Sequence, residues 1–168
     1  MHTDICSGVT VAGDSGQAFR EGNNLNVKCP MVPHEGMPVK IRVVLADDHR
    51  EMIARVRGIL GDEFEVVQAV VNGIQAVRAV LALDPDVLVT DISMPLLDGL
   101  QAARNIQNAN SRVKIIFLTI HEDQDFIAAA FSAGATAYVT KRRLSSDLVL
   151  AIREALKGRT FVSNSAHS

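Results

Sequence analysis

The chain has 168 residues, of which 48% are hydrophobic and 21% charged, a composition that suits one packed domain with some additional length. Its formal net charge of −2 provides no general attraction for nucleic acid or for an anionic membrane surface. No apolar run approaches the roughly 20 residues of a membrane span, no secretory signal pattern is visible, and Cys6 and Cys29 lack ligand-spaced partners, so we expect a cytoplasmic protein with free thiols.

Residues 1–38 differ in character from the rest of the chain. They are rich in Gly, Asn, Ser and Pro, and they show neither the period of a strand nor that of a helix. We interpret this segment as a disordered N-terminal extension. Because Met37 directly precedes the first predicted strand, a mis-assigned start codon is an alternative explanation for the extension.

From Val39 onward, predicted strands and helices alternate. Runs rich in Val, Ile and Leu predict strands over residues 39–46, 64–71, 87–91, 113–119 and 137–140. Apolar residues at helical spacing predict helices over residues 50–60, 73–83, 99–109, 123–134 and 145–158. Gly61, Gly134 and Gly158 are typical helix-end residues. Ser145 or Ser146 is the expected N-cap of the last helix.

This alternation predicts an α/β fold with a doubly wound, five-stranded parallel sheet and helices on both faces. In such a sheet the ligand site lies beyond the carboxyl ends of the strands. Polar residues reach that edge from four strands: Asp47 and Asp48 after the first, Asp91 at the end of the third, Thr119 at the end of the fourth and Lys141 after the fifth. We therefore expect these side chains to lie close together.

Three carboxylates that converge in a crevice repel one another unless a cation neutralises them. Oxygen ligands favour hard ions such as Mg²⁺, Mn²⁺ or Ca²⁺. A carboxylate can also attack a phosphoryl group when a metal, a fixed cation and a hydroxyl donor meet the phosphoryl oxygens. Lys141 and Thr119 are of the required chemical types, so the residues predict a metal-dependent aspartyl-phosphate site.

Four motifs carry a resemblance to a known family: "ADDH", "LVTDISMPLLDGL", "IIFLT" and "GATAYVTK". In this order they resemble the receiver domain of bacterial two-component response regulators, over residues 39–158. The rhythm of the last third is similar to the subfamily that usually carries a C-terminal helix-turn-helix. The resemblance implies a flavodoxin-like fold with the strand order 2-1-3-4-5.

The resemblance also implies roles for individual residues. Asp91 is expected to accept the phosphoryl group, Lys141 to pair with it and Thr119 to hydrogen-bond it once it is attached. Tyr138 matches the aromatic residue whose ring turns inward after Thr119 moves. Mg²⁺, or Mn²⁺ in its place, is expected on the following ligands: Asp47, Asp48, Asp91 and the backbone carbonyl of Ser93.

The function implied is that of a phosphorylation-driven switch and not of an enzyme, apart from self-catalysed phosphotransfer and autodephosphorylation. The expected partners are a sensor histidine kinase or phosphotransfer protein and a downstream protein, without direct nucleic-acid or membrane binding, and with a homodimer on phosphorylation as an option. Residues 159–168 are interpreted as a short tail, too short for a DNA-binding domain. The receiver half of a truncated transcriptional regulator is therefore the alternative.

Two further functions compete with this interpretation. A phosphatase of the haloacid-dehalogenase type would need an acid two residues after its nucleophile, but Ser93 occupies that position after Asp91. A receiver-like module that binds proteins without phosphorylation would tolerate the loss of an acidic residue, Thr or Lys, and none is lost.

Structural roles are an alternative for several of the residues singled out. The acidic pair after the first strand can cap a helix, and Asp98 is interpreted as such a cap. Tyr138 can be an ordinary half-buried strand aromatic. His49, at the start of a helix, is interpreted as a solvent-facing residue, and His121 as a loop residue without a role, with contact to an incoming partner as the alternative.

Overall fold

The computed structural model describes residues 39–163, so the predicted N-terminal extension and residues 164–168 lie outside the described residues. The strands of the described part are β1 (Ile41–Ala46), β2 (Phe64–Val70), β3 (Val87–Thr90), β4 (Lys114–Thr119), β5 (Ala137–Thr140) and β6 (Phe161–Val162). Its helices are α1 (Arg50–Leu60), α2 (Gly73–Leu83), α3 (Gly99–Asn108), α4 (Gln124–Ser132) and α5 (Leu144–Leu156). Short 3₁₀ turns follow α1 and β5, over Gly61–Glu63 and Lys141–Arg143.

The strands form one parallel sheet in the order β2-β1-β3-β4-β5-β6. The expected order 2-1-3-4-5 is therefore present, but the expectation of a five-stranded sheet is wrong. Phe161 and Val162 pair with Ala137 and Tyr138 and add a sixth strand beside β5. A two-residue strand is too short to show a period of two, and its pairing depends on residues more than twenty positions earlier in the chain.

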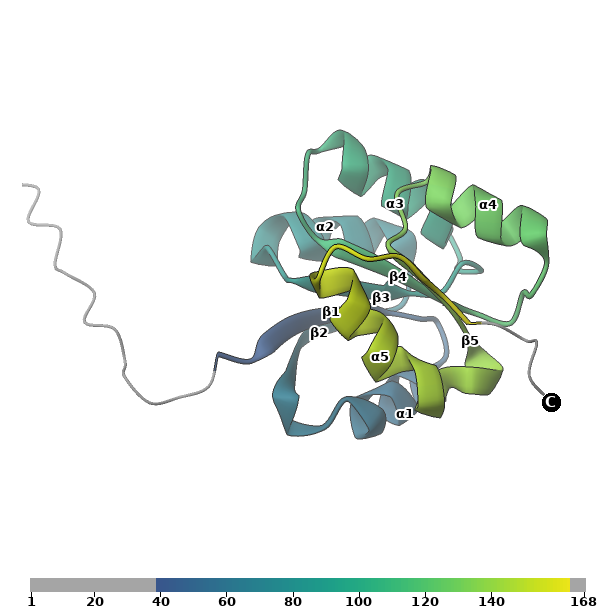
Figure 1. Ribbon diagram of the computed structural model, residues 1–168. Helices are drawn as coiled ribbons and strands as arrows, with labels where there is room; N and C mark the ends of the chain where they lie inside the picture. The colour runs from purple at the N-terminus through teal and green to yellow at the C-terminus, as the bar shows by residue number, and fades with distance from the viewer. Residues whose placement is uncertain (1–38, 164–168) are drawn as a thin grey trace, which may run out of the picture. The chain divides into compact units, whose positions relative to one another are not determined.

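Helices cover both faces of the sheet, with α1 and α5 on one face and α2, α3 and α4 on the other (Figure 1). The side chains of β1 alternate between the two layers: Val43 and Leu45 pack with α1 and α5, and Val44 and Ala46 pack toward α2 and α3. This two-sided burial explains why the central strands are continuous apolar runs. Among the described residues, no helix has both the length and the apolar character needed to cross a lipid bilayer.

The helices begin and end within two residues of the positions predicted from the sequence. Asp98 caps α3, since its carboxylate accepts a hydrogen bond from the Gln101 N–H at 2.7 Å, as predicted. The prediction of Ser145 or Ser146 as the N-cap of α5 is wrong, because α5 begins at Leu144. The preceding residues, Lys141–Arg143, form a 3₁₀ turn that continues directly into the helix, so the helix begins earlier in the chain than predicted.

Candidate functional site

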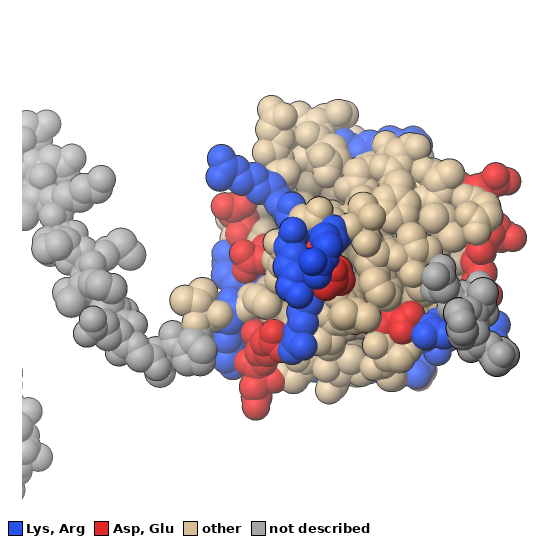
Figure 2. Space-filling view, in the orientation of Figure 1, with Lys and Arg blue, Asp and Glu red and all other residues tan. Residues whose placement is uncertain are grey.

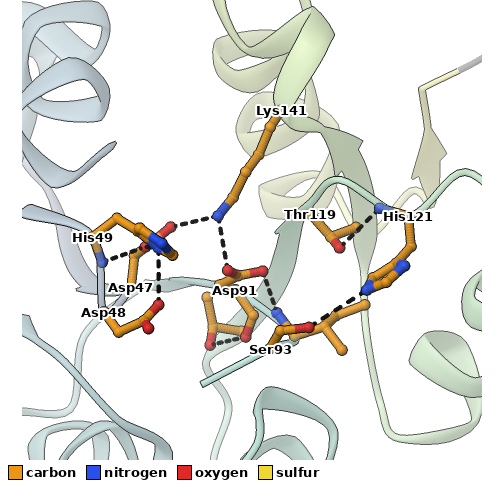
Figure 3. A network of polar contacts seen from close by, with 10 residues as sticks. Asp47, Asp48, His49, Asp91, Ser93, Thr119, His121 and Lys141 are labelled. Carbon is orange, nitrogen blue, oxygen red and sulfur yellow. Dashed lines mark hydrogen bonds and ion pairs between the residues drawn. The ribbon is translucent and has the colours of Figure 1, made fainter. Parts of the chain in front are cut away.

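The carboxyl ends of four strands bring the predicted site residues together (Figure 3). Asp47 follows β1, Asp91 follows β3, Thr119 ends β4 and Lys141 follows β5. These strands are neighbours in the sheet, so residues far apart in the sequence reach one edge. Beside them lies an open hollow of about 360 Å³ with the following lining residues: His49, Glu51, Met52, Asp91, Ser93, Ile120 and Lys141.

Lys141 is the central cation of this edge. Its Nζ donates hydrogen bonds to Asp91 Oδ2 at 2.7 Å and to Asp47 Oδ2 at 2.9 Å. The Lys141 side chain is only 11% exposed, and both carboxylates are buried. Burial acts to lower the pKa of the Lys141 ammonium, but its hydrogen bonds to Asp91 and Asp47 outweigh burial and raise the pKa above its usual value. The ammonium group is therefore charged at neutral pH.

An acidic cluster lies next to this lysine. Asp47, Asp48, His49 and Asp91 each place one potential ligand atom within 4.8 Å of the others. Asp47 and Asp91 are buried, whereas Asp48 and His49 are exposed. His49 Nδ1 lies 2.9 Å from Asp48 Oδ1 and 3.1 Å from Asp47 Oδ1. Three carboxylates beside a solvent-open hollow form a hard-oxygen donor set that suits Mg²⁺ or Mn²⁺.

Asp91 is held by its own backbone surroundings. Its Oδ1 accepts a hydrogen bond from the Ile92 N–H at 2.7 Å, which leaves Oδ2 to Lys141. The loop after β3 folds back over it, so that the Gly99 N–H donates to the Ile92 carbonyl at 2.8 Å. A Cβ atom at position 99 would lie 2.0 Å from the Asp91 carbonyl oxygen, so only glycine fits there.

Thr119 and Tyr138 meet at the backbone of His121. Thr119 Oγ1 accepts a hydrogen bond from the His121 N–H at 3.2 Å, and the Tyr138 hydroxyl donates to the His121 carbonyl at 2.9 Å. Tyr138 is fully buried, although a half-buried ring was the structural alternative. Burial raises the pKa of the Tyr138 hydroxyl to about 12. The two predicted switch residues are thus joined through one residue of the loop between β4 and α4.

The two histidines that received no role in the sequence analysis both contact the site. The His121 ring stacks on Phe126 of α4 with ring centroids 4.0 Å apart, and its Nε2 lies 3.4 Å from Ser93 Oγ. His49 borders the acidic cluster and the hollow. The only sequence feature that could have placed His121 at the site is its position two residues after Thr119. A loop histidine has no periodic pattern from which its contacts could be inferred.

Comparison with known proteins gives a consistent result. A family model described as "Response regulator receiver domain" matches residues 43–153. The transcriptional regulatory protein DegU of Brevibacillus brevis is 33% identical over 125 residues, which cover 73% of this chain and 53% of DegU. The response regulator UvrY of Escherichia coli O157:H7 is 36% identical over 126 residues, which cover 74% of this chain and 58% of UvrY.

Solved structures agree with these relatives. A two-component response regulator of the LuxR family from Aurantimonas sp. SI85-9A1 superposes with a TM-score of 0.69 and 31% identity, over 73% of this chain and 89% of that one. The isolated receiver domain of RcsB from Salmonella enterica, solved with the phosphomimetic BeF₃⁻, superposes with a TM-score of 0.68 and 27% identity, over 75% and 95% of the two chains.

This chain spans about half the length of the curated relatives it matches. One of these relatives is named a transcriptional regulatory protein. The comparisons therefore do not support the expectation that direct nucleic-acid binding is excluded.

Proposed function

Because this chain belongs to the response regulator receiver domain family of two-component systems, we propose that Asp91 is its phospho-acceptor. An oxygen of the Asp91 carboxylate attacks the phosphorus of a phosphohistidine on a sensor kinase or phosphotransfer protein. The phosphorus–nitrogen bond breaks, and the imidazole leaves. Asp47, Asp48, Asp91 and the Ser93 carbonyl would hold Mg²⁺, which neutralises charge on the phosphoryl oxygens when it is bound.

The observation that carries this proposal is the position of Lys141. Its ammonium group lies 2.7 Å from one oxygen of the Asp91 carboxylate, beside an open hollow. From this position the ammonium group can transfer its hydrogen bond from the carboxylate to an oxygen of an attached phosphoryl group, with little rearrangement of the Lys141 side chain. Because Lys141 also contacts Asp47, it holds a proposed metal ligand and the proposed acceptor in one geometry.

The proposed switch uses the shared contact with His121. An attached phosphoryl group adds a charge of about −1.5 to −2 and offers an acceptor to the Thr119 hydroxyl. The hydrogen bond between Thr119 and the His121 N–H would then change, and with it the loop that leads into α4. The Tyr138 hydroxyl contacts the same loop, because it donates a hydrogen bond to the His121 carbonyl.

The surface that would change its binding preference lies over α4, β5 and α5. Figure 2 shows a largely uncharged surface over α4, whereas charged side chains gather over α5 and the adjoining loops. The exposed residues of α4 are small or polar, such as Ala128 and Ser132, whereas its Phe and Ile side chains pack against the core. This surface suits a downstream protein or a second copy of the chain, and the cytoplasm is the proposed location.

The relatives' names favour a second candidate, in which the receiver controls transcription as part of a regulator that binds DNA. This candidate uses the same phosphorylation site and differs in its output. It would be supported by an attached or separate DNA-binding partner that responds to the phosphorylated chain.

Labelling with a small phosphodonor tests the central proposal. The wild type and Asp91→Asn are incubated with Mg²⁺ and acetyl phosphate, and the phosphorylated fraction is measured by intact-mass spectrometry. We expect labelling of the wild type and none of Asp91→Asn. Asp98→Asn is the matched control, because asparagine also caps a helix and this variant should be labelled like the wild type. Equal labelling of wild type and Asp91→Asn, or none in either, would overturn the proposal.

A further inference from the structure

The segment after α5 returns to the sheet and docks beside Tyr138. The Phe161 N–H donates to the Thr136 carbonyl at 3.2 Å, and the Ser163 N–H donates to the Tyr138 carbonyl at 2.8 Å. The side chains of Phe161 and Val162 pack against opposite core layers of the sheet, and both are only half-buried. The proposed switch tyrosine is therefore hydrogen-bonded at its hydroxyl to the β4–α4 loop and at its carbonyl to the segment after α5.

A buried carboxylate on α5 fastens this segment. Asp147 Oδ2 accepts a hydrogen bond from Ser163 Oγ at 2.6 Å and another from Arg143 Nε at 2.8 Å. Asp147 Oδ1 accepts from Ser146 Oγ at 2.6 Å. Asp147 is 6% exposed and Ser163 is 5% exposed. Burial acts to raise the pKa of Asp147, but the hydrogen bonds from Arg143, Ser146 and Ser163 outweigh it and lower the pKa.

This clasp, formed by Asp147 and Ser163, takes no part in the phosphorylation chemistry. A two-residue strand with half-buried side chains gains little from apolar packing, so its docking depends strongly on the clasp and on its backbone hydrogen bonds. Segments of low local stability are those that open and close most readily during a conformational change. One hydrogen bond, from the Ser163 N–H to the Tyr138 carbonyl, connects the clasp directly to the proposed switch tyrosine.

We infer that Asp147 is a positioning residue that couples the docking of β6, through Ser163, to the position of Tyr138. The inference rests on the proposed function, because it makes the segment after α5 respond to phosphorylation of Asp91. The Tyr138 carbonyl lies in β5, so a shift of this strand at Tyr138 on phosphorylation would move the acceptor of the Ser163 N–H and change the protection of β6. Coupling of this kind is reciprocal, so release of β6 also changes the environment of Tyr138.

The first experiment needs no phosphorylation. Tyr138 is the only tyrosine and the chain has no tryptophan, so intrinsic fluorescence reports on this residue alone. In the full chain, Ser163→Ala should speed the exchange of the Phe161 and residue-163 amides about fivefold, which corresponds to one lost hydrogen bond, and should change Tyr138 emission. Asp147→Asn should do the same to a greater extent.

Ser146→Ala is the matched control, since it removes a hydrogen bond of the same length to the same carboxylate without touching β6. It should leave Tyr138 emission and the β6 amides as in the wild type. The same exchange rates in Ser163→Ala and Ser146→Ala, or unchanged Tyr138 emission in Ser163→Ala, would overturn the inference. Far-UV circular dichroism shows whether each variant keeps its fold.

The second experiment compares amide exchange of β6 before and after labelling with acetyl phosphate. We expect the exchange rate of the Ser163 amide to change severalfold in labelled wild type and to stay constant in Asp91→Asn. Labelled protein with unchanged exchange would refute the inference and leave the proposed function standing. Absence of labelling would refute the proposed function, and the fluorescence comparison would then decide the coupling of β6 to Tyr138 by itself.

Discussion

Lys141 Nζ and Asp91 Oδ2 lie 2.7 Å apart, with the same ammonium group 2.9 Å from Asp47 Oδ2. One largely buried cation thus pairs with two carboxylates that follow different strands. This sharing means that any change at Lys141 affects the stability of the fold and the proposed chemistry together. The two effects can be separated by adding a divalent metal.

Lys141→Met should lower the free energy of unfolding by roughly 2 kcal/mol in the absence of divalent ions, because two buried carboxylates lose their charged donor. Mg²⁺ should restore part of this loss, because without the lysine the carboxylates repel one another more strongly and a bound cation relieves that repulsion. Urea unfolding with and without MgCl₂ measures both values. Lys157→Met, which removes an exposed lysine, is the control and should change little. An equal loss for Lys141→Met in both buffers would contradict the expectation.

Asp47 and Asp48 should respond differently to substitution by Asn. Asp48 is the more exposed and lacks a hydrogen bond to Lys141 in the described structure, so Asp48→Asn should weaken Mg²⁺ binding while leaving the metal-free stability equal or higher. Asp47→Asn also loses the ionic partner of Lys141 and should weaken both. Calorimetric Mg²⁺ titration and urea unfolding test this pair. Loss of stability in Asp48→Asn without metal would show that repulsion in the cluster is unimportant.

The Tyr138 hydroxyl should titrate with a pKa of about 12 in the folded protein. After unfolding in urea the value should return to near 10. Because the chain has a single tyrosine, the ultraviolet absorbance of tyrosinate measures this group directly. Tyr138→Phe removes the signal and serves as the blank. A native-state titration near 10 would mean that the ring is accessible to solvent.

The stability of the fold should decrease at alkaline pH. The pKa values of Tyr138 and Lys141 are both raised on folding, so their contributions are complete below their unfolded values and are lost as pH rises through the folded ones. For Tyr138 this window extends from about 10 to about 12. Urea unfolding at a series of pH values should show a shallower decline in Tyr138→Phe than in the wild type. The same slope in both proteins would exclude a contribution from Tyr138.

Gly99→Ala should destabilise the protein by more than ~2 kcal/mol and impair phosphorylation, because the new methyl group would collide with the Asp91 carbonyl. Gly58→Ala provides the contrast, since position 58 lies in α1 with open space around it. That variant should gain about 0.5–1 kcal/mol from the higher helix propensity of alanine. Thermal unfolding compares the two. Similar effects of both substitutions would show that the loop after β3 adapts.

The main features of the fold could be predicted from the sequence because each depends on a local pattern. The apolar runs of β1 and β3 are mostly buried and are directly followed by Asp47 and Asp91, so the edge that carries the site could be predicted, whereas the strand order came from the family resemblance. The cap at Asp98 depends on one side chain and its own helix. Such features need no knowledge of distant contacts.

The features that could not be predicted depend on tertiary contacts. β6 consists of two residues that become a strand only because β5 offers a free edge, and Ser163 finds Asp147 across α5. Complete burial of Tyr138 depends on the surrounding segments as well as on its own strand. The contacts of the His121 ring with Ser93 and Phe126 involve a loop side chain, whose direction no sequence period encodes.

The order in which the chain is synthesised gives the position of Lys141 a further consequence. Lys141 comes 94 residues after Asp47 and 50 residues after Asp91. A chain that emerges from the ribosome can therefore pair β1 with β3, and bring the two aspartates together, before β5 exists. Charge balance at this edge can be completed only after the residue that follows the fifth strand has been synthesised.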